Sequence, residues 1–312
     1  MPELRLNEKP EGIRQAIIPL LLLIIAFAMR FYNLSYIEGF ISDEPMHVPG
    51  AINYAERGYF GPDTWHHPPL KHLLMYGSIR LFGDNPFGWR MRNLIFGAGS
   101  IAMLFLLAQM VTEKTIIALF ASLLLLLDPL HVLLSRLSFE DIPAMFFMLT
   151  GIFFFLRHLK DRSLFNLILS GLFLGLSTAC KIYGAFIIAT LLIIFLVRNF
   201  KEPLVIAEGI VYLGILPLTV YILTYYPWFQ RGYSFSEWLG MQADAMREMS
   251  TTTGFHPLLM KISGPERWFF LPVGLSFYNE EVNGSARHII MMNNIFVWIF
   301  ILPATAYMLV SA

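Results

Sequence analysis

The chain has 312 residues, of which 56% are hydrophobic and 14% charged, with a mean hydropathy of +0.61 and no net charge. A soluble globular protein carries about 25% charged residues, so this composition excludes an ordinary soluble domain and indicates a polytopic membrane protein. The zero net charge argues against a nucleic-acid partner, and the single cysteine, Cys180, excludes a disulfide framework.

Eight apolar stretches predict membrane-spanning helices, because each approaches the length that crosses a bilayer. The break between the fifth and sixth rests on Cys180-Lys181, since the whole of 164–198 is too long for one span. No cleavage signature of a signal peptide precedes the first stretch, which we expect to remain as a helix. The predicted spans are about 14–32, 93–111, 115–128, 142–157, 164–180, 183–198, 203–225 and 288–310.

Short basic turns predict the orientation of these helices. Arg157, Lys160 and Arg162 lie between the fourth and fifth spans, and Arg198 and Lys201 lie between the sixth and seventh. Both turns fall on the same side as the N-terminus. The positive-inside rule makes that side cytoplasmic.

Two long outer loops follow from this arrangement, at about 33–92 and about 226–287. Within them, residues 70–82 and 235–249 repeat apolar side chains at near-helical spacing among charges. Such segments are typical of helices that lie along the membrane interface. We therefore expect nearly all polar chemistry on the outer face.

The pair Asp43-Glu44 follows the first predicted span. Taken alone, it is compatible with a solvated loop dipeptide, or with a helix N-terminus stabilised by the helix dipole. Carboxylates held at a membrane boundary are costly, however, unless they serve a function. Proton transfer from an acceptor to a carboxylate is the function that this position suggests.

A second polar group in the first loop is His66-His67-Pro68-Pro69-Leu70-Lys71. The prolines predict an extended turn that leads into a helix, so the histidines are held rigidly. Zinc binding is disfavoured, because adjacent histidines point apart and no nearby acid has ligand spacing. We expect this group to shape the pocket around Asp43.

Cations lie near several of the predicted helix ends. Arg90 precedes the second span, Arg136 lies between the third and fourth, and Lys181 ends the fifth. One such residue is often a snorkelling side chain, but several on one face predict a phosphate site. Asp141, five residues after Arg136, is expected to orient that arginine. In the second loop, His256 alone is more typical of a structural residue.

In order along the chain, these segments resemble the protein O-mannosyltransferases and the related polyprenyl-phosphate-dependent glycosyltransferases of GT-C architecture. The resemblance covers nearly the whole chain. Six segments carry it: Asp43-Glu44, His67 to Lys71, Gly88 to Met91, Ser135-Arg136 with Asp141, Gly175 to Lys181, and His256-Pro257 with Lys261.

Departures from the family pattern occur late in the chain. Leu258 and Met260 stand where the family has tyrosine and serine, and Asn293-Asn294-Ile295 replaces an expected Asn-Pro. Family members continue with further helices, so the chain is expected to be one GT-C-like domain, residues 1–312, that lacks them. The short second loop has no room for the lectin-like module of fungal and animal members. A bacterial or archaeal source is therefore expected.

The resemblance implies an inverting glycosyltransferase that moves a sugar, expected to be mannose, from a polyprenyl-phosphate donor to a hydroxyl acceptor. Its implied setting is the plasma membrane, with membrane lipids around it, the active site outside and no cofactor or metal required. The acceptor would be serine or threonine of an exported protein. The implied roles are Asp43 and Glu44 in catalysis, Arg90, Arg136 and Lys181 at the donor phosphate, and His66, His67, Lys71, Asp141 and His256 in shaping the pocket.

Three alternatives remain open from the sequence. The acceptor could instead be a lipid or a cell-wall component. A transporter would carry ionisable residues in the middle of its spans and inverted repeats, and the chain shows neither pattern; Glu208, near a span start, is the nearest case. A membrane scaffold without activity is the third alternative.

Overall fold

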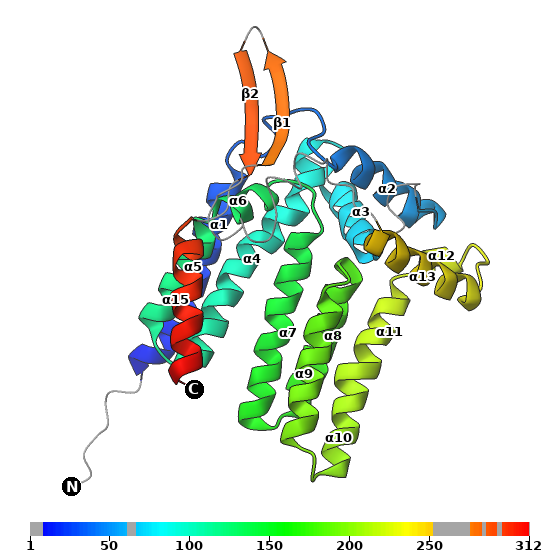
Figure 1. Cartoon of the computed structure of the whole chain (residues 1–312). Helices are drawn as coiled ribbons and strands as arrows, with labels where there is room; N and C mark the ends of the chain where they lie inside the picture. Colours follow the sequence, from blue (N-terminus) through cyan, green and yellow to red (C-terminus); the bar gives the residue numbers. More distant parts are fainter. Residues whose placement is uncertain (1–8, 61–66, 252–274, 283–284, 292–294, 312) are drawn as a thin grey trace.

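The protein is described by a computed structural model that covers residues 9–60, 67–251, 275–282, 285–291 and 295–311. Long helices run side by side in a bundle, and shorter helices gather at one end of it (Figure 1). The elements are α1 (Lys9–Phe31), α2 (Glu44–Arg57), α3 (Leu70–Phe82), α4 (Pro86–Thr112), α5 (Thr115–Leu126), α6 (Pro129–Leu134), α7 (Asp141–Asp161), α8 (Leu164–Cys180), α9 (Gly184–Arg198), α10 (Pro203–Gly209), the π-helical segment η1 (Ile210–Ile215), α11 (Leu216–Leu223), α12 (Tyr226–Phe229), α13 (Phe235–Thr251), β1 (Leu275–Val282), β2 (Ser285–Met291) and α15 (Ile295–Ser311).

Helix α4 joins two groups of helices, because it packs against α1 and α5 on one side and α7 on the other. Buried side chains such as Leu22 and Phe105 form the core of the first group. Phe155, Leu174 and Leu213 form the core of the second, between α7, α8, α9 and η1. The two cores lie in the two groups of helices that α4 joins.

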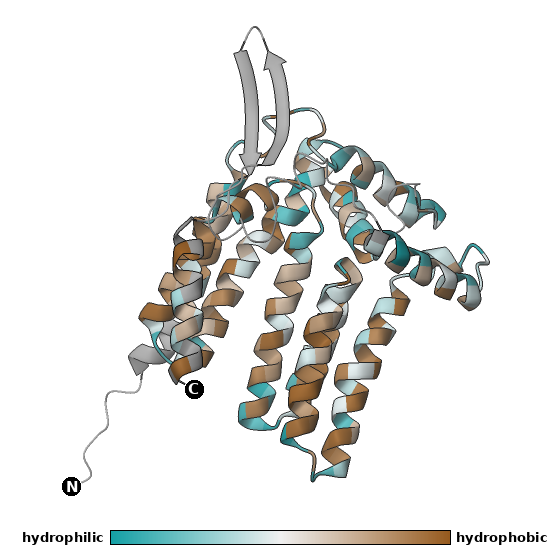
Figure 2. Ribbon diagram, viewed as in Figure 1, coloured by the Kyte–Doolittle hydropathy of each residue, from teal (hydrophilic) through white to brown (hydrophobic). Residues whose placement is uncertain are grey.

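Hydrophobic residues predominate along the long helices, and hydrophilic residues are frequent on α2 and α13 at one end (Figure 2). Within the described residues, three helices are long and apolar enough to cross a membrane, namely 86–112, 141–161 and 203–223. The other apolar helices there are shorter, at 16–31, 115–126, 164–180 and 184–198. The predicted membrane character and helical class are therefore confirmed, with one hairpin in addition.

The two predicted interfacial segments form helices at the expected places, α3 and α13. The predicted break after the fifth span is also present, since α8 ends at Cys180 and α9 begins at Gly184. The predicted start of the second span, at about residue 93, was wrong. Helix α4 begins at Pro86, where Asn85 caps it by accepting a hydrogen bond from the Gly88 N–H.

The prediction of one helix over 288–310 was wrong at its beginning. Ser285–Met291 instead forms strand β2, which pairs antiparallel with β1, and the helix α15 starts only at Ile295. Ile289 to Met292 are apolar, which is compatible with the start of a membrane-spanning helix. Short apolar runs fit a strand as well as a helix, and pairing with a partner strand decides between them.

The seventh predicted span is one continuous rod that changes its winding at η1. Pro217 is the second residue of α11, which follows this segment. Because proline has no N–H and its ring collides with the carbonyl four residues back, a wider π-turn before it relieves the clash. Gly214 in this segment faces an apolar cavity that is described below.

Close packing of α8 against η1 depends on Gly171. A Cβ atom at this position would overlap the carbonyl oxygen of Tyr212. We expect Gly171→Ala to force the two segments apart and to destabilise the protein by about 1–3 kcal/mol, seen as a lower unfolding midpoint in detergent. Gly240→Ala on α13 is the control, because nothing lies within 4 Å of its added Cβ. Equal midpoints for both variants would contradict this role of Gly171.

Candidate active site

Asp43 and Glu44 lie at the start of α2, with Asp43 at the N-cap position. The residue before them, Ser42, has a φ of 51°, which is uncommon for a residue with a side chain. Asp43 is half-buried, whereas Glu44 is 1% exposed. The two adjacent carboxylates therefore occupy different surroundings, and only Asp43 is accessible.

Glu44 is fully engaged with the protein itself. Its Oε1 accepts a hydrogen bond from Arg90 Nε at 3.0 Å, and its Oε2 accepts from Arg90 Nη2 at 2.9 Å. Oε2 also accepts from the Ile41 N–H at 3.0 Å. Glu44 is thus placed to hold the turn that carries Asp43.

Arg90, on the first turns of α4, donates all five of its N–H groups within the protein. Besides the two bonds to Glu44, Nη1 donates to the carbonyls of Leu34 and Ile37, and Nη2 donates to the carbonyl of Gly39. A guanidinium has five N–H donors, so none remains for a phosphate. Arg90 instead fastens the first loop to α4.

A buried carboxylate that was not among the predicted site residues, Glu140, lies at the centre of the site. It is 4% exposed and directly precedes α7. Its Oε1 is 3.5 Å from Lys181 Nζ and 3.6 Å from His67 Nε2. Its Oε2 is 3.8 Å from His47 Nε2 and 3.9 Å from Lys71 Nζ. We call these five residues the Glu140 cluster.

The charges of the Glu140 cluster support one another. Burial lowers the pKa of Lys71, and the charge of Glu140 opposes this. Burial alone would raise the pKa of Glu140, but Lys71, His47, Lys181 and His67 together hold it well below its usual value. Opposite charges about 4 Å apart attract by about 4 kcal/mol at an effective dielectric near 20, comparable to the cost of burying an ion.

Lys181 lies in the link between α8 and α9, with a quarter of its side chain exposed. Its Nζ donates to both carboxylate oxygens of Asp141, at 2.7 and 2.8 Å. Burial opposes its charge, but Glu140 and Asp141 raise its pKa. The expectation that Asp141 orients Arg136 was therefore wrong, because both of its oxygens hold Lys181.

Arg136 has different surroundings. Its Nη2 donates to the carbonyls of Tyr32 and Asn33, at 2.9 and 3.0 Å. It lines a cavity of about 400 Å³ beside Arg90. Among the described residues Arg136 forms no ion pair, and its contacts do not join it to Lys181. Its role at the donor phosphate stays a prediction.

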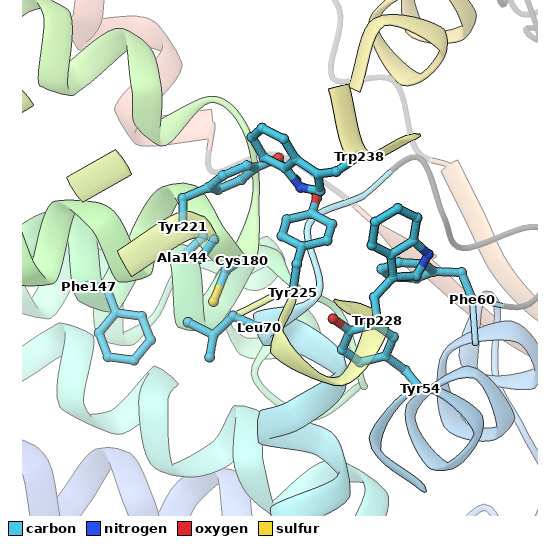
Figure 3. Packing of buried hydrophobic residues seen from close by; sticks show 11 residues of the cluster. Tyr54, Phe60, Leu70, Ala144, Phe147, Cys180, Tyr221, Tyr225, Trp228 and Trp238 are labelled. Atoms are coloured by element: carbon cyan, nitrogen blue, oxygen red, sulfur yellow. Dashed lines mark hydrogen bonds between the residues drawn. The ribbon is translucent and has the colours of Figure 1, made fainter. Parts of the chain in front are cut away.

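An aromatic core includes Leu70 and Cys180, the chain neighbours of Lys71 and Lys181, and Ala144, three residues after Asp141 (Figure 3). Figure 3 shows Tyr221 and Tyr225 next to Trp238 in this core. The two tyrosine hydroxyls lie 3.0 Å apart, and both bond to Gln242. This packing fixes the elements that carry the charged residues.

An apolar cavity of about 320 Å³ opens beside the same core, between α8, α9, α11 and α13. Thr178 and Ile182 line it close to Lys181, and Pro68 lines it next to His67. An apolar hollow with charged groups near its rim suits a molecule with an oily chain and an anionic head.

Two predicted site residues, His66 and His256, lie outside the described residues. No group of three or more His, Cys, Asp or Glu side chains within the described part of the chain is arranged to hold a metal ion. That no metal is required stays a prediction. A signal for Glu140 was present in the sequence, because it precedes Asp141 in the polar link Ser135–Asp141 between two apolar stretches.

Comparison with known proteins places this arrangement in a family. Residues 66–228, just over half of the chain, match the family described as dolichyl-phosphate-mannose-protein mannosyltransferase. The chain is 26% identical over 257 residues to the polyprenol-phosphate-mannose–protein mannosyltransferase of Corynebacterium glutamicum, with 66% of this chain and 49% of that protein covered. It spans half or less of the length of the curated relatives that it matches.

Two solved structures share the fold. One is the Saccharomyces cerevisiae protein O-mannosyltransferase Pmt1-Pmt2 complex bound to the sugar donor, with a TM-score of 0.62 and 20% identity over 70% of this chain and 34% of that one. The other is ArnT from Cupriavidus metallidurans in the apo state, with a TM-score of 0.53 and 16% identity. The match covers 80% of this chain and 48% of that one. The chain belongs to the dolichyl-phosphate-mannose-protein mannosyltransferase family and has the GT-C fold.

Proposed function

We propose that the chain transfers mannose from a polyprenyl-phosphate donor to a hydroxyl group of an exported protein. The half-buried carboxylate of Asp43 at the start of α2 is the observation that carries the proposal. Family membership supports the donor and the protein acceptor. The fixed charges of the Glu140 cluster support the chemistry.

In the proposed reaction, Asp43 takes the proton of the acceptor hydroxyl while that oxygen attacks the anomeric carbon of the sugar. The bond from this carbon to the phosphate oxygen breaks, so the configuration inverts and polyprenyl phosphate leaves with an additional negative charge. A positioned general base contributes about 10²–10⁴ in rate. Cations fixed beforehand stabilise the leaving phosphate.

Lys181 is the cation best placed for this phosphate. It is partly exposed and held by Asp141, and the apolar cavity begins at its chain neighbour Ile182. The polyprenyl chain would lie in that cavity. Arg90 and Glu44 take a positioning role in this proposal, since their hydrogen bonds hold the loop of Asp43.

The proposed site faces outward. α2, α3, α6 and the start of α7 lie at one end of the bundle, and the turn after α7 lies at the opposite end (Figure 1). That opposite end carries Arg157, Lys160 and Arg162, a pattern typical of a cytoplasmic face. The donor phosphate and the acceptor would meet at the outer membrane–water boundary.

The direct test is transfer by the purified protein in lipid nanodiscs. Polyprenyl-phosphate mannose is supplied with a serine- and threonine-containing peptide, and mass spectrometry reports the mannosylated product. Mannose on the peptide supports the proposal. Mannose found only on a supplied lipid acceptor would replace the protein acceptor with a lipid one, and no transfer to any acceptor would contradict the enzyme assignment.

Lys181→Ala should weaken the binding of the donor more than that of the acceptor. Loss of a charged hydrogen bond to the phosphate is expected to raise the donor KM about tenfold or more. Steady-state rates at varied donor and acceptor concentrations measure both constants. Lys160→Ala is the control, because Lys160 is an exposed lysine at the other end of the bundle. An unchanged donor KM in Lys181→Ala would remove this residue from the phosphate site.

A further inference from the structure

The Glu140 cluster brings side chains from three separate parts of the chain to one carboxylate. His47 comes from α2, His67 precedes α3, Lys71 lies on α3, and Lys181 follows α8. All four approach Glu140 within 3.5 to 3.9 Å. In the other ion pairs of the described residues, each carboxylate pairs with one cationic side chain.

The cluster has an inner and an outer side. Lys71 and Glu140 side chains are 3% and 5% exposed, whereas those of His67 and Lys181 are 24% and 25% exposed. Lys71 Nζ and Glu140 Oε2 are buried and have no hydrogen-bond partner, and they face each other at 3.9 Å. An inner ion pair therefore supports two outer groups that a substrate can reach.

We propose that Glu140 is a positioning residue of the site: its carboxylate keeps the inner Lys71 charged and fixes His67 and Lys181 at the open side of the cluster. The inference rests on the proposed mannosyl transfer and extends it. Glu140 itself does not touch substrate, since it is buried behind the two outer side chains.

The protonation of Lys71 is the property that Glu140 controls. Burial lowers its pKa, and the positive charges of Arg92 and Lys181 act in the same direction. Glu140 raises the pKa most among the opposing groups, followed by Asp43. Without Glu140 the pKa would fall further, so the lysine would lose its proton at a lower pH; a buried lysine can titrate as low as about 5–6.

Other groups around Lys71 bear on the same titration. They are His47 of α2, His67 before α3, His72 of α3, Arg92 of α4, Lys181 after α8 and Asp43 before α2. Burial lowers the pKa of both His47 and His72, and the charge of Lys71 adds to this. Burial and the charge of Lys71 therefore both disfavour protonation of these two histidines.

Glu140→Gln should give the enzyme a pH dependence that the wild type lacks. As Lys71 loses its proton, the positive charge behind the phosphate site disappears, so the donor KM of the variant should rise about tenfold between about pH 6 and about pH 9. The wild-type donor KM should stay nearly constant over the same range. The ratio of variant to wild-type donor KM at each pH is the measurement.

Three further variants separate a positioning role from a merely structural one. Glu140→Asp keeps the charge and should restore a flat pH profile. Lys71→Met combined with Glu140→Gln should remove the new pH dependence, because the titrating group is absent. Glu113→Gln is the matched control, since Glu113 forms an exposed pair with Lys160 at 3.4 Å. A donor KM in Glu140→Gln that is independent of pH would overturn the proposal.

A stability measurement tests the same pairing without any transfer activity. Glu140→Gln, Lys71→Met and the double variant are compared by their thermal unfolding midpoints in detergent. If Glu140 keeps Lys71 charged, the double variant should lose less than the sum of the two single losses. Additive losses would overturn the proposal even if transfer occurs. Coupled losses without transfer would count against the proposed function alone.

Discussion

Asp43→Asn is expected to lower the rate of mannosyl transfer about 10²–10⁴-fold while the donor still binds. The amide keeps the size of the side chain and its place at the start of α2, but it cannot accept a proton from the acceptor hydroxyl. The structure favours Asp43 over its neighbour, because Asp43 is half-buried and accessible whereas Glu44 is committed to Arg90. The measurement is kcat at saturating donor and acceptor, with donor affinity measured separately.

Glu38→Gln is the control for this experiment, because Glu38 is an exposed carboxylate in the same loop. The Glu38→Gln variant should retain the wild-type rate. Both variants should unfold at the wild-type midpoint in a thermal melt. Wild-type turnover in Asp43→Asn at a normal protein level would exclude Asp43 as the base. A small drop in kcat with a large rise in acceptor KM would assign it to acceptor binding instead.

The helices could be predicted from the sequence wherever one local pattern decides. α3 and α13 followed from the spacing of apolar residues among charges, because a helix at an interface must bury one face only. The break at Lys181 followed from the length limit of a membrane span. β2 could not be predicted in this way, since its stability comes from pairing with β1 rather than from its own residues.

The charged site was predicted only in part, because its members meet through the fold. Arg90, Arg136 and Lys181 were grouped by charge and by expected membrane face, but a sequence does not show which N–H groups are already occupied. Glu44 and the loop carbonyls occupy every donor of Arg90. The Glu140 cluster joins residues from 47 to 181, a contact that no local periodicity reports.

The hydrogen bonds of Arg92 show how this assembly is enforced. Its Nη1 donates to the carbonyl of Lys71 and its Nη2 donates to the carbonyl of Phe139. One side chain of α4 therefore holds both α3 and the segment that leads to Glu140. The buried Arg92 therefore helps to hold Lys71 and Glu140 close to each other.

Glu44→Gln should destabilise the protein strongly and release the loop that carries Asp43. The Glu44–Arg90 pair is buried on both sides, with side chains 0% and 2% exposed, and its oxygens take two hydrogen bonds from Arg90. Removing one partner of a buried ion pair leaves an uncompensated charge and costs about 3–5 kcal/mol. Unfolding by increasing concentrations of a denaturing detergent gives the free energy of unfolding. Limited proteolysis reports the exposure of residues 34–44.

Two comparisons make the Glu44→Gln result interpretable. Glu113→Gln breaks an exposed pair and should cost about 1 kcal/mol or less. Glu44→Gln combined with Arg90→Met removes both buried charges, so the double variant should be more stable than the sum of its single variants implies. Because Asp43 remains in place, activity in Glu44→Gln should fall together with the ordering of the loop. A stable variant with an ordered loop but no activity would instead give Glu44 a direct part in catalysis.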